Sequence, residues 1–339
     1  MDISIILSVI YTKISASTSI EEVLILSKIA EKIKIGNVRV VSTYGEMLLA
    51  SSISDGSVFF VESEENLYFQ YGPNKILMLN FTSGVFSWGL NTYGRLGDNT
   101  VVAKSSPVSV VGGFTDWIQV SAGGYHSLGI RSNGTAWAWG RNNYGQLGDN
   151  TIVSKSSPVS VVGGFTDWIQ VSAGSGHSLG IRSNGTAWAW GYNLNGRLGD
   201  GTQAAKSSPV SVVGGFTDWV QVSAGGSFSL GLRSNGTAWS WGLNSFGALG
   251  DNTTVSKTSP VSVVGGFTDW VQLSAGGTSF GLGLRANGTA WTWGYNTSGR
   301  LGDNTIVSKS SPVSVVGGFA DWVQVSAGNA HSLAIRTFR

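Results

Sequence analysis

The sequence predicts an all-β fold built from copies of one small antiparallel sheet, and three observations support this. Trp-Gly pairs recur at almost constant steps of 51, 51, 51 and 52 residues, at Trp88, Trp139, Trp190, Trp241 and Trp293. Asp-Trp pairs recur with the same steps. The 339 residues include 49 glycines, no cysteine and 12% charged residues, a composition typical of an ordered, turn-rich protein.

The first 72 residues do not follow the repeat, and we expect a separate N-terminal module there. Ser19 and Glu22 form a capping box ahead of an amphipathic pattern that predicts a helix over residues 20–34. Strand-like patterns follow, and two short apolar runs, 59–61 and 67–69, predict the arms of a hairpin. Residues 1–72 are therefore interpreted as a helix plus β-hairpin attachment module.

One segment of this module has a second interpretation. Residues 65–70 (ENLYFQ) also spell an engineered protease site. The segment lies far from either terminus, is followed by Tyr71 rather than a small residue, and fits the hairpin pattern. We therefore interpret it as native sequence.

Residues 73–339 form the repeat domain, and each unit predicts four short strands. In one copy an apolar strand, 126–131, meets an Asn133-Gly134 turn, which tolerates the positive φ of a tight hairpin. The return strand is 135–139. A polar loop then leads to KSSPVSVVGG, whose proline favours an edge position, and to the strand FTDWIQVSAG.

Sheets of this kind have two apolar faces and cannot bury both alone. Equal copies that pack face to face around an axis form a β-propeller of four-stranded blades. Tryptophans two residues apart share one face of a strand, so we expect them to pack between neighbouring sheets. These structural tryptophans are Trp88, Trp137, Trp139, Trp188, Trp190, Trp239, Trp241, Trp291 and Trp293.

The segment 120–148, VSAGGYHSLGIRSNGTAWAWGRNNYGQLG, resembles the signature of the regulator of chromosome condensation repeat. The resemblance extends over residues 73–339 and implies a propeller of four-stranded blades, most often seven. This chain has only five Trp-Gly hairpins. The ring could close as five blades, as six with strands from residues 57–71, or as an open arc completed by another subunit.

The N-terminal part, VRVVSTYGEM and GSVFFVESEENLYFQYG, resembles short β modules of virion proteins from tailed marine phages, especially cyanophages. This looser resemblance implies a virion component of the tail, collar or fibre. Its expected partners are other virion proteins, held through residues 1–72, and a host-surface protein or glycan. The expected state is a homo-oligomer or multicopy assembly in the extracellular particle, with a cytoplasmic location as the alternative.

The polar residues of the repeats do not predict an active site, a metal or a cofactor. His126, His177 and His331 share one repeat position that Phe228 occupies elsewhere, so we expect an imidazole bonded to backbone rather than a general base. One aspartate per loop, as at Asp149, predicts an Asx turn. Residues 1–72 carry five Lys/Arg and nine Asp/Glu, and residues 73–339 sixteen and ten, which is too diffuse for a nucleic-acid surface. No stretch is long enough to span a membrane.

The loops after Trp-Gly and after Ala-Gly differ between copies although the framework hardly changes. Tyrosine and arginine, which are enriched in protein interfaces, recur in them. The predicted binding residues are Tyr93, Arg95, Tyr125, Arg141, Tyr144, Tyr192, Arg197, Phe246, Tyr295 and Arg300. Neutral drift of exposed loops is the competing explanation. The function predicted is non-enzymatic binding, and the alternatives are a small-GTPase nucleotide-exchange regulator and a carbohydrate-binding or enzyme-inhibiting propeller.

Overall fold

The computed structural model describes residues 38–41, 58–61, 66–72, 75–79, 84–277 and 279–337. Its contacts divide the chain into two units, Met1–Thr82 and Ser83–Arg339, whereas the sequence interpretation placed the boundary after residue 72. The helix predicted over residues 20–34 lies outside the described residues.

The described residues of the first unit form a four-stranded sheet in the order β1-β2-β3-β4. Strand β1 (Val38–Val41) runs parallel to β2 (Val58–Val61), and β2, β3 (Asn66–Gly72) and β4 (Lys75–Leu79) are antiparallel neighbours. The pairing of β2 with β3 confirms the predicted hairpin. The described segment 66–70 lies inside β3.

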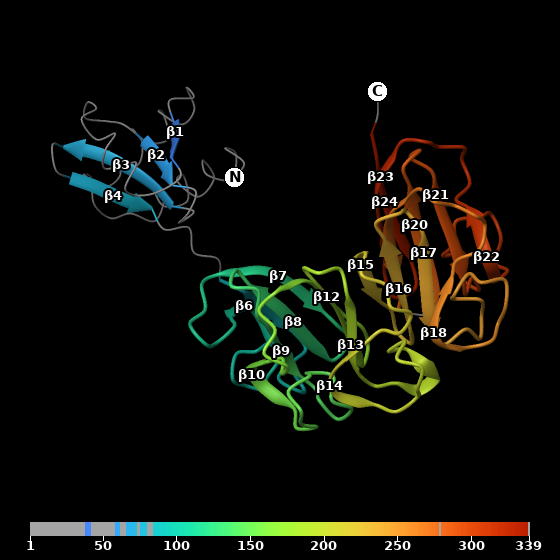
Figure 1. Ribbon diagram of the computed structural model, residues 1–339, viewed down its shortest axis with the longest axis horizontal. Helices are drawn as coiled ribbons and strands as arrows, with labels where there is room; N and C mark the ends of the chain where they lie inside the picture. Colours follow the sequence, from blue (N-terminus) through green and yellow to red (C-terminus); the bar gives the residue numbers. More distant parts are fainter. Residues whose placement is uncertain are drawn as a thin grey trace. The chain divides into compact units, whose positions relative to one another are not determined.

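The second unit is an arc of antiparallel sheets (Figure 1). Four blades are complete, with four strands each, which confirms the predicted architecture. The first consists of β7 (Trp117–Ala122), β8 (His126–Arg131), β9 (Ala136–Gly140) and β10 (Lys155–Ser160). The remaining strands of complete blades are β11 (Trp168–Ala173), β12 (His177–Arg182), β13 (Ala187–Gly191), β14 (Lys206–Ser211), β15 (Trp219–Ala224), β16 (Phe228–Arg233), β17 (Ala238–Gly242), β18 (Lys257–Ser262), β19 (Trp270–Ala275), β20 (Phe280–Arg285), β21 (Ala290–Gly294) and β22 (Lys309–Ser314).

Half-blades stand at the two ends of this arc. One is the two-stranded sheet of β5 (Phe86–Gly89) and β6 (Lys104–Ser109), and the other pairs β23 (Trp322–Ala327) with β24 (Ser332–Arg336). By repeat position, β5 and β6 correspond to the third and fourth strands of a blade, and β23 and β24 to the first and second. A short 3-10 helix, η1 (Leu194–Gly196), lies in one loop.

The hairpin turn of each complete blade needs its glycine. Gly134 has φ of 72°, and a Cβ there would collide with the carbonyl oxygen of Thr166. The turn therefore sits directly against the chain that leads into the next blade. Its position confirms the predicted Asn-Gly hairpin and explains why this copy cannot accept another residue after the asparagine.

The core lies between successive blades and is centred on the inner tryptophan of each pair. Trp139 is only 2% exposed and packs edge-on against Trp117 of its own blade, with ring centroids 5.8 Å apart. Its indole also lies against Gly97, in the loop of the preceding sheet, where a Cβ would come within 2.8 Å of Trp139 Nε1. The outer Trp137 is half-buried and packs on Phe114.

The same arrangement recurs along the arc, with one exception at its start. Trp190, Trp241 and Trp293 are fully buried, and Trp188, Trp239 and Trp291 are half-buried on the phenylalanine of their blade. Trp88, in contrast, is 64% exposed. In the described part of the arc, the sheet that contains Trp88 has no first and second strand, and no blade precedes it.

Candidate functional site

The antiparallel register gives each blade two distinct ends. In the first complete blade His126 pairs with Gly140 at one end, and Ile130 pairs with Ala136 at the other. The second end carries the uniform Asn-Gly-Thr turns, and we call these turns, 132–135 and their repeats, the framework rim. The first end carries the loops that differ between copies, and we call it the variable rim. Its described residues are 90–95, 123–125, 141–146, 174–176, 192–197, 225–227, 243–248, 276–277, 279 and 295–300.

The carboxylates of the arc stabilise the blades and their loops. Residues 84–337 contain ten aspartates and no glutamate. Five of them pair with an arginine of their own blade, as Asp116 does with Arg131 Nε at 2.8 Å. The other five hold the loop after Trp-Gly. Asp149 Oδ1 accepts hydrogen bonds from the Thr151 amide at 3.0 Å and from Asn142 Nδ2 at 2.9 Å, which confirms the predicted Asx turn.

Asn142 is the centre of that loop and is completely buried. Its Nδ2 donates to Asp149 and to the carbonyl oxygens of Thr151 and Val153, and its Oδ1 accepts from the Leu147 amide at 2.9 Å. Asn91, Asn193, Asn244 and Asn296 make the same bonds in their copies. The loop backbone is thus fixed in every copy, while the side chains that it presents differ.

The repeated histidine is part of the core, and the prediction that its ring bonds to backbone is wrong. His126 is fully buried, and its Nε2 lies 2.8 Å from Ser178 Oγ in the next blade. Ser178 Oγ donates its proton to the Gln146 carbonyl oxygen, so His126 Nε2–H is the donor to Ser178 Oγ. Burial lowers the pKa of His126 to about 3. His177 repeats the contact with Ser229, and its pKa is also lowered by burial.

Seven of the ten predicted loop residues form one continuous set of contacts on the variable rim. The Arg141 guanidinium lies over the rings of Tyr93, Tyr125 and Tyr144, at 5.1, 5.2 and 5.8 Å from their centroids. Arg95 also lies over Tyr125, at 5.3 Å. We call the set of Tyr93, Arg95, Tyr125, Arg141, Tyr144, Tyr192 and Arg197 the Tyr–Arg cluster.

The cluster continues into the next loop of the arc. The rings of Tyr144 and Tyr192 lie 4.2 Å apart, and the Arg197 guanidinium lies 4.6 Å from the Tyr192 centroid. Arg197 donates from Nη1 to the Gly226 carbonyl oxygen at 3.1 Å and from Nε to that of Leu194, so its position is fixed by backbone. Burial lowers the pKa of Arg197 from its ordinary value.

The other three predicted residues form a separate group. The rings of Phe246 and Tyr295 lie 4.4 Å apart, and the Arg300 guanidinium lies 4.6 Å from the Tyr295 centroid. This group has one arginine and no contact with the Tyr–Arg cluster among the described ring and cation contacts. The variable rim therefore carries two aromatic patches of different charge.

A pocket of about 430 Å³ opens beside the Tyr–Arg cluster, and Arg141, Tyr144, Tyr192 and Arg197 line it. Gln146 lines it too and was not among the predicted residues. Gln146 is 1% exposed; its Oε1 accepts from the Tyr144 amide, while its Nε2 has no partner among the described residues. The signal for Gln146 was its repeat position, where the other copies carry Arg95, Arg197, Ala248 and Arg300.

The described residues contain no group of three or more histidine, cysteine or acidic side chains that could hold a metal. None of the described helices is long and apolar enough to cross a membrane. The chemistry of the variable rim is therefore that of hydrogen-bond donors, cations and aromatic rings.

Comparisons with known proteins agree with the repeat geometry. The family model of the regulator of chromosome condensation (RCC1) repeat matches residues 83–130, 133–181, 184–232, 235–280 and 287–335. Human E3 ubiquitin-protein ligase HERC2 is 30% identical over 76% of this chain, and the Arabidopsis thaliana ultraviolet-B receptor UVR8 is 27% identical over 74%. The chain spans 6% of HERC2 and 58% of UVR8.

Solved structures show the same fold. Prp20p from Saccharomyces cerevisiae has a TM-score of 0.67 and 18% identity, covering 86% of this chain and 71% of its own. Human WBSCR16 has a TM-score of 0.66 and 22% identity, covering 80% and 70%. Since the matched repeats take in most of the second unit, this chain belongs to the regulator of chromosome condensation (RCC1) repeat family.

Proposed function

We propose that this protein is a non-enzymatic binding propeller whose Tyr–Arg cluster receives an acidic segment of a partner protein. The observation that carries the proposal is the placement of Arg141. Its guanidinium is surrounded by three tyrosine rings, and its buried Nε has no hydrogen-bond partner among the described residues.

The distribution of charge supports an acidic partner. Framework arginines such as Arg131 are paired with aspartates, but the ion pairs of the described residues include none with Arg95, Arg141 or Arg197. None of the described residues that line the pocket is acidic. A partner carboxylate supplies the charge that the chain does not, and a guanidinium can bind it through two parallel hydrogen bonds.

Rigidity of the site supports affinity. The loop backbone is fixed by Asn142 and Asn193, and Arg197 is held by two backbone carbonyls before any partner arrives. Side chains that are already ordered lose little conformational entropy on binding. Tyrosine and arginine are also the residues that most often dominate protein interfaces.

The other interpretations receive less support. The relatives named above are cellular proteins, and they lend no support to the virion role inferred from residues 1–72. A glycan site needs open ring faces, whereas Tyr192 is packed between Tyr144 and Arg197. Nucleotide exchange on a small GTPase remains the second candidate, because the family match favours it and the solved structure of Prp20p is described with its binding to Gsp1p and histones.

Site-specific photo-crosslinking tests the binding function. A photoreactive phenylalanine analogue replaces Tyr125 on the variable rim or Asn184 on the framework rim, both exposed, in the full chain expressed in its own cells. We expect discrete crosslinked protein partners from Tyr125 and none from Asn184. Equal crosslinking from the two rims would contradict the proposal. Release of bound nucleotide from a crosslinked GTPase by the purified chain would favour the second candidate.

A further inference from the structure

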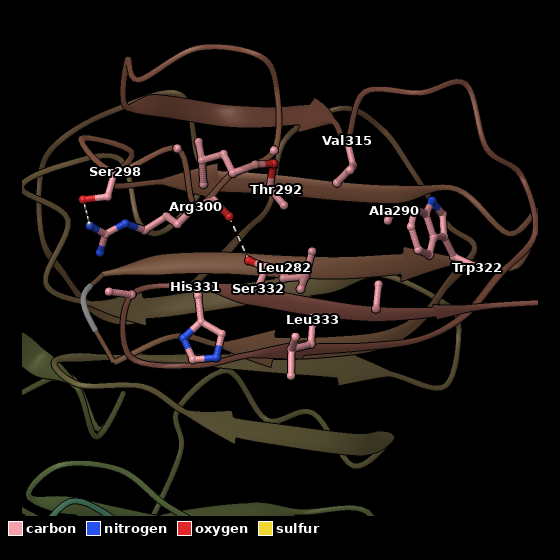
Figure 2. A pocket seen from close by; sticks show the side chains of 15 residues that line it. Leu282, Ala290, Thr292, Ser298, Arg300, Val315, Trp322, His331, Ser332 and Leu333 are labelled. Atoms are coloured by element: carbon pink, nitrogen blue, oxygen red, sulfur yellow. Dashed lines mark hydrogen bonds between the residues drawn. The ribbon is translucent and has the colours of Figure 1, made fainter.

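A pocket of about 380 Å³ lies where the last complete blade meets the half-blade of β23 and β24 (Figure 2). Leu282, Thr292, Leu301, Trp322 and Leu333 are among the residues that line it. Its wall is largely apolar. No described strand pairs with the outer edge of β24, so this side of the half-blade is open.

The preceding blades show what fills this position. In each of them the glycine of a Leu-Gly-Asp loop lies against the inner tryptophan on the third strand of the next blade. The pairs are Gly97 with Trp139, Gly148 with Trp190, Gly199 with Trp241 and Gly250 with Trp293. At Gly302, the fifth glycine of the series, the nearest atom to a Cβ is instead Val315 Cγ1, at 3.4 Å. The pocket is therefore a socket for an indole on a third strand, which we call the indole socket.

The same chain carries an exposed third strand of the required sequence. Strand β5 holds Trp88 at the repeat position of Trp139, in a half-blade that has third and fourth strands only. Trp88 is 64% exposed, and Phe86 beside it is also exposed. At the opposite end Leu333 is 63% exposed, whereas Leu128, at its repeat position, is completely buried.

We propose that β5 of a second copy of this chain pairs with β24, so that Trp88 of one copy fills the indole socket of the other. The two half-blades then form one complete blade in the order β23-β24-β5-β6. A second copy is the occupant because the two half-blades stand at the two ends of the arc and form separate sheets (Figure 1).

The complete blades specify the register of this pairing. Leu128 pairs with Ala138 and Ser127 with Trp139 in the first of them, and the other three blades have the same register at these positions. By repeat position, Leu333 then lies opposite Ser87, and Ser332 opposite Trp88. A shift by one residue would turn Trp88 away from the socket, because neighbouring side chains of a strand point to opposite faces.

The aromatic contacts are complementary as well. Phe114 packs on both Trp117 and Trp137 of its blade, at centroid distances of 5.8 and 4.6 Å. In the last half-blade Phe319 packs on Trp322 at 5.7 Å. Phe86 stands at the repeat position of Trp137 and supplies the missing third ring. Each copy has one end of each kind, so the contact is head-to-tail and extends into closed rings or chains of copies.

Cysteine crosslinking tests the register, since the chain has no cysteine of its own. In the double variant Ser87→Cys with Leu333→Cys, directly opposed positions are close enough for a disulfide. We expect oxidised protein to migrate as two or more linked copies and to return to one copy with reductant. The matched variant Ser87→Cys with Ala334→Cys is one residue out of register and should form at least tenfold less linked product.

If β24 or β5 pairs with a strand of its own chain instead, the disulfide-linked products differ. A disulfide of Ser87→Cys with Leu333→Cys inside single copies would mean that the ring closes on itself. Efficient linkage within one copy in a Leu77→Cys with Ser87→Cys variant would assign the edge of β5 to β4 of the same chain. Either product would overturn the proposal.

The mass in solution tests the role of the indole. We expect the unaltered chain to elute, with light scattering, at twice its mass of 35.5 kDa or more, and Trp88→Ala to elute at 35.5 kDa. Ile306→Ala, which removes an exposed apolar side chain outside the socket, should leave the assembly unchanged. An unaltered chain that stays at 35.5 kDa over the micromolar range would refute the inference.

Discussion

Replacement of His126 by phenylalanine should remove part of the acid sensitivity of the fold. The imidazole is completely buried, and its pKa falls from 6.5 to about 3 on folding because burial disfavours the charged ring. The unfolded chain therefore binds the proton more readily than the folded chain. Stability from this group is complete above pH 6.5 and is lost as the pH falls toward 3.

The size of the effect follows from the two pKa values. At pH 4.5 the unfolded imidazole is two pH units below its pKa and the folded one is still neutral. At about 1.4 kcal/mol per unit, the free energy of unfolding falls by about 3 kcal/mol on account of His126. Phenylalanine is a suitable replacement because Phe228 occupies the same repeat position and is completely buried there.

The assay is urea unfolding followed by tryptophan fluorescence at pH 7.5 and pH 4.5. The unaltered chain should lose about 3 kcal/mol more stability between these pH values than His126→Phe does. Equal losses in the unaltered chain and His126→Phe would refute the buried neutral imidazole.

Two further predictions concern the packing that positions the variable rim. Gly148→Ala should destabilise the fold by about 3 kcal/mol, because φ is 69° and the Cβ would lie 2.8 Å from Trp190 Nε1. Gly164→Ala, with φ of 66° and open space, should cost only about 1 kcal/mol, and similar midpoints in urea for the two variants would contradict the indole contact. Asn142→Ala should lower the free energy of unfolding by about 3 kcal/mol, because it leaves buried polar groups of the loop without partners. Asn133→Ala, at an exposed turn, should lower it by about 1 kcal/mol. A lower melting temperature for Asn133→Ala than for Asn142→Ala would contradict the loop network.

The blades were predictable because their causes are local. Alternation, the Asn133-Gly134 turn and the fixed spacing of Trp139 and its repeats are all visible along the chain, and the family resemblance agreed with them. The Asx turn at Asp149 depends on a threonine two residues away. Such short-range chemistry leaves its pattern in the sequence.

Contacts between blades were harder to predict. Ser178 is 52 residues from His126, and a backbone partner was expected instead. Trp88 and Trp139 stand in the same local pattern, yet one is exposed and the other buried, because burial depends on which sheet comes before them. The virion role rested on residues 1–72 and gained no support from the family to which the repeats belong.

The candidate site shows both situations. Its residues could be selected from the sequence because they vary between copies. Which of them contact one another could not be predicted. Arg141 reaches Tyr93 because loops one repeat apart become neighbours around the arc. Gln146 was passed over because its importance comes from burial beside the pocket, and sequence variation does not report burial.

The measurement that tests the acidic-partner proposal most directly is the affinity of a fluorescein-labelled hexaglutamate peptide, determined by anisotropy for the full chain and two matched variants. Gln146→Glu places a carboxylate in the pocket, and Asn184→Asp adds the same charge at the framework rim. We predict that Gln146→Glu weakens binding at least about tenfold, that Asn184→Asp changes it less than about twofold, and that hexaglutamine does not bind. Equal affinity of the two variants for hexaglutamate, or no binding by the unaltered chain at millimolar peptide, would contradict the proposal.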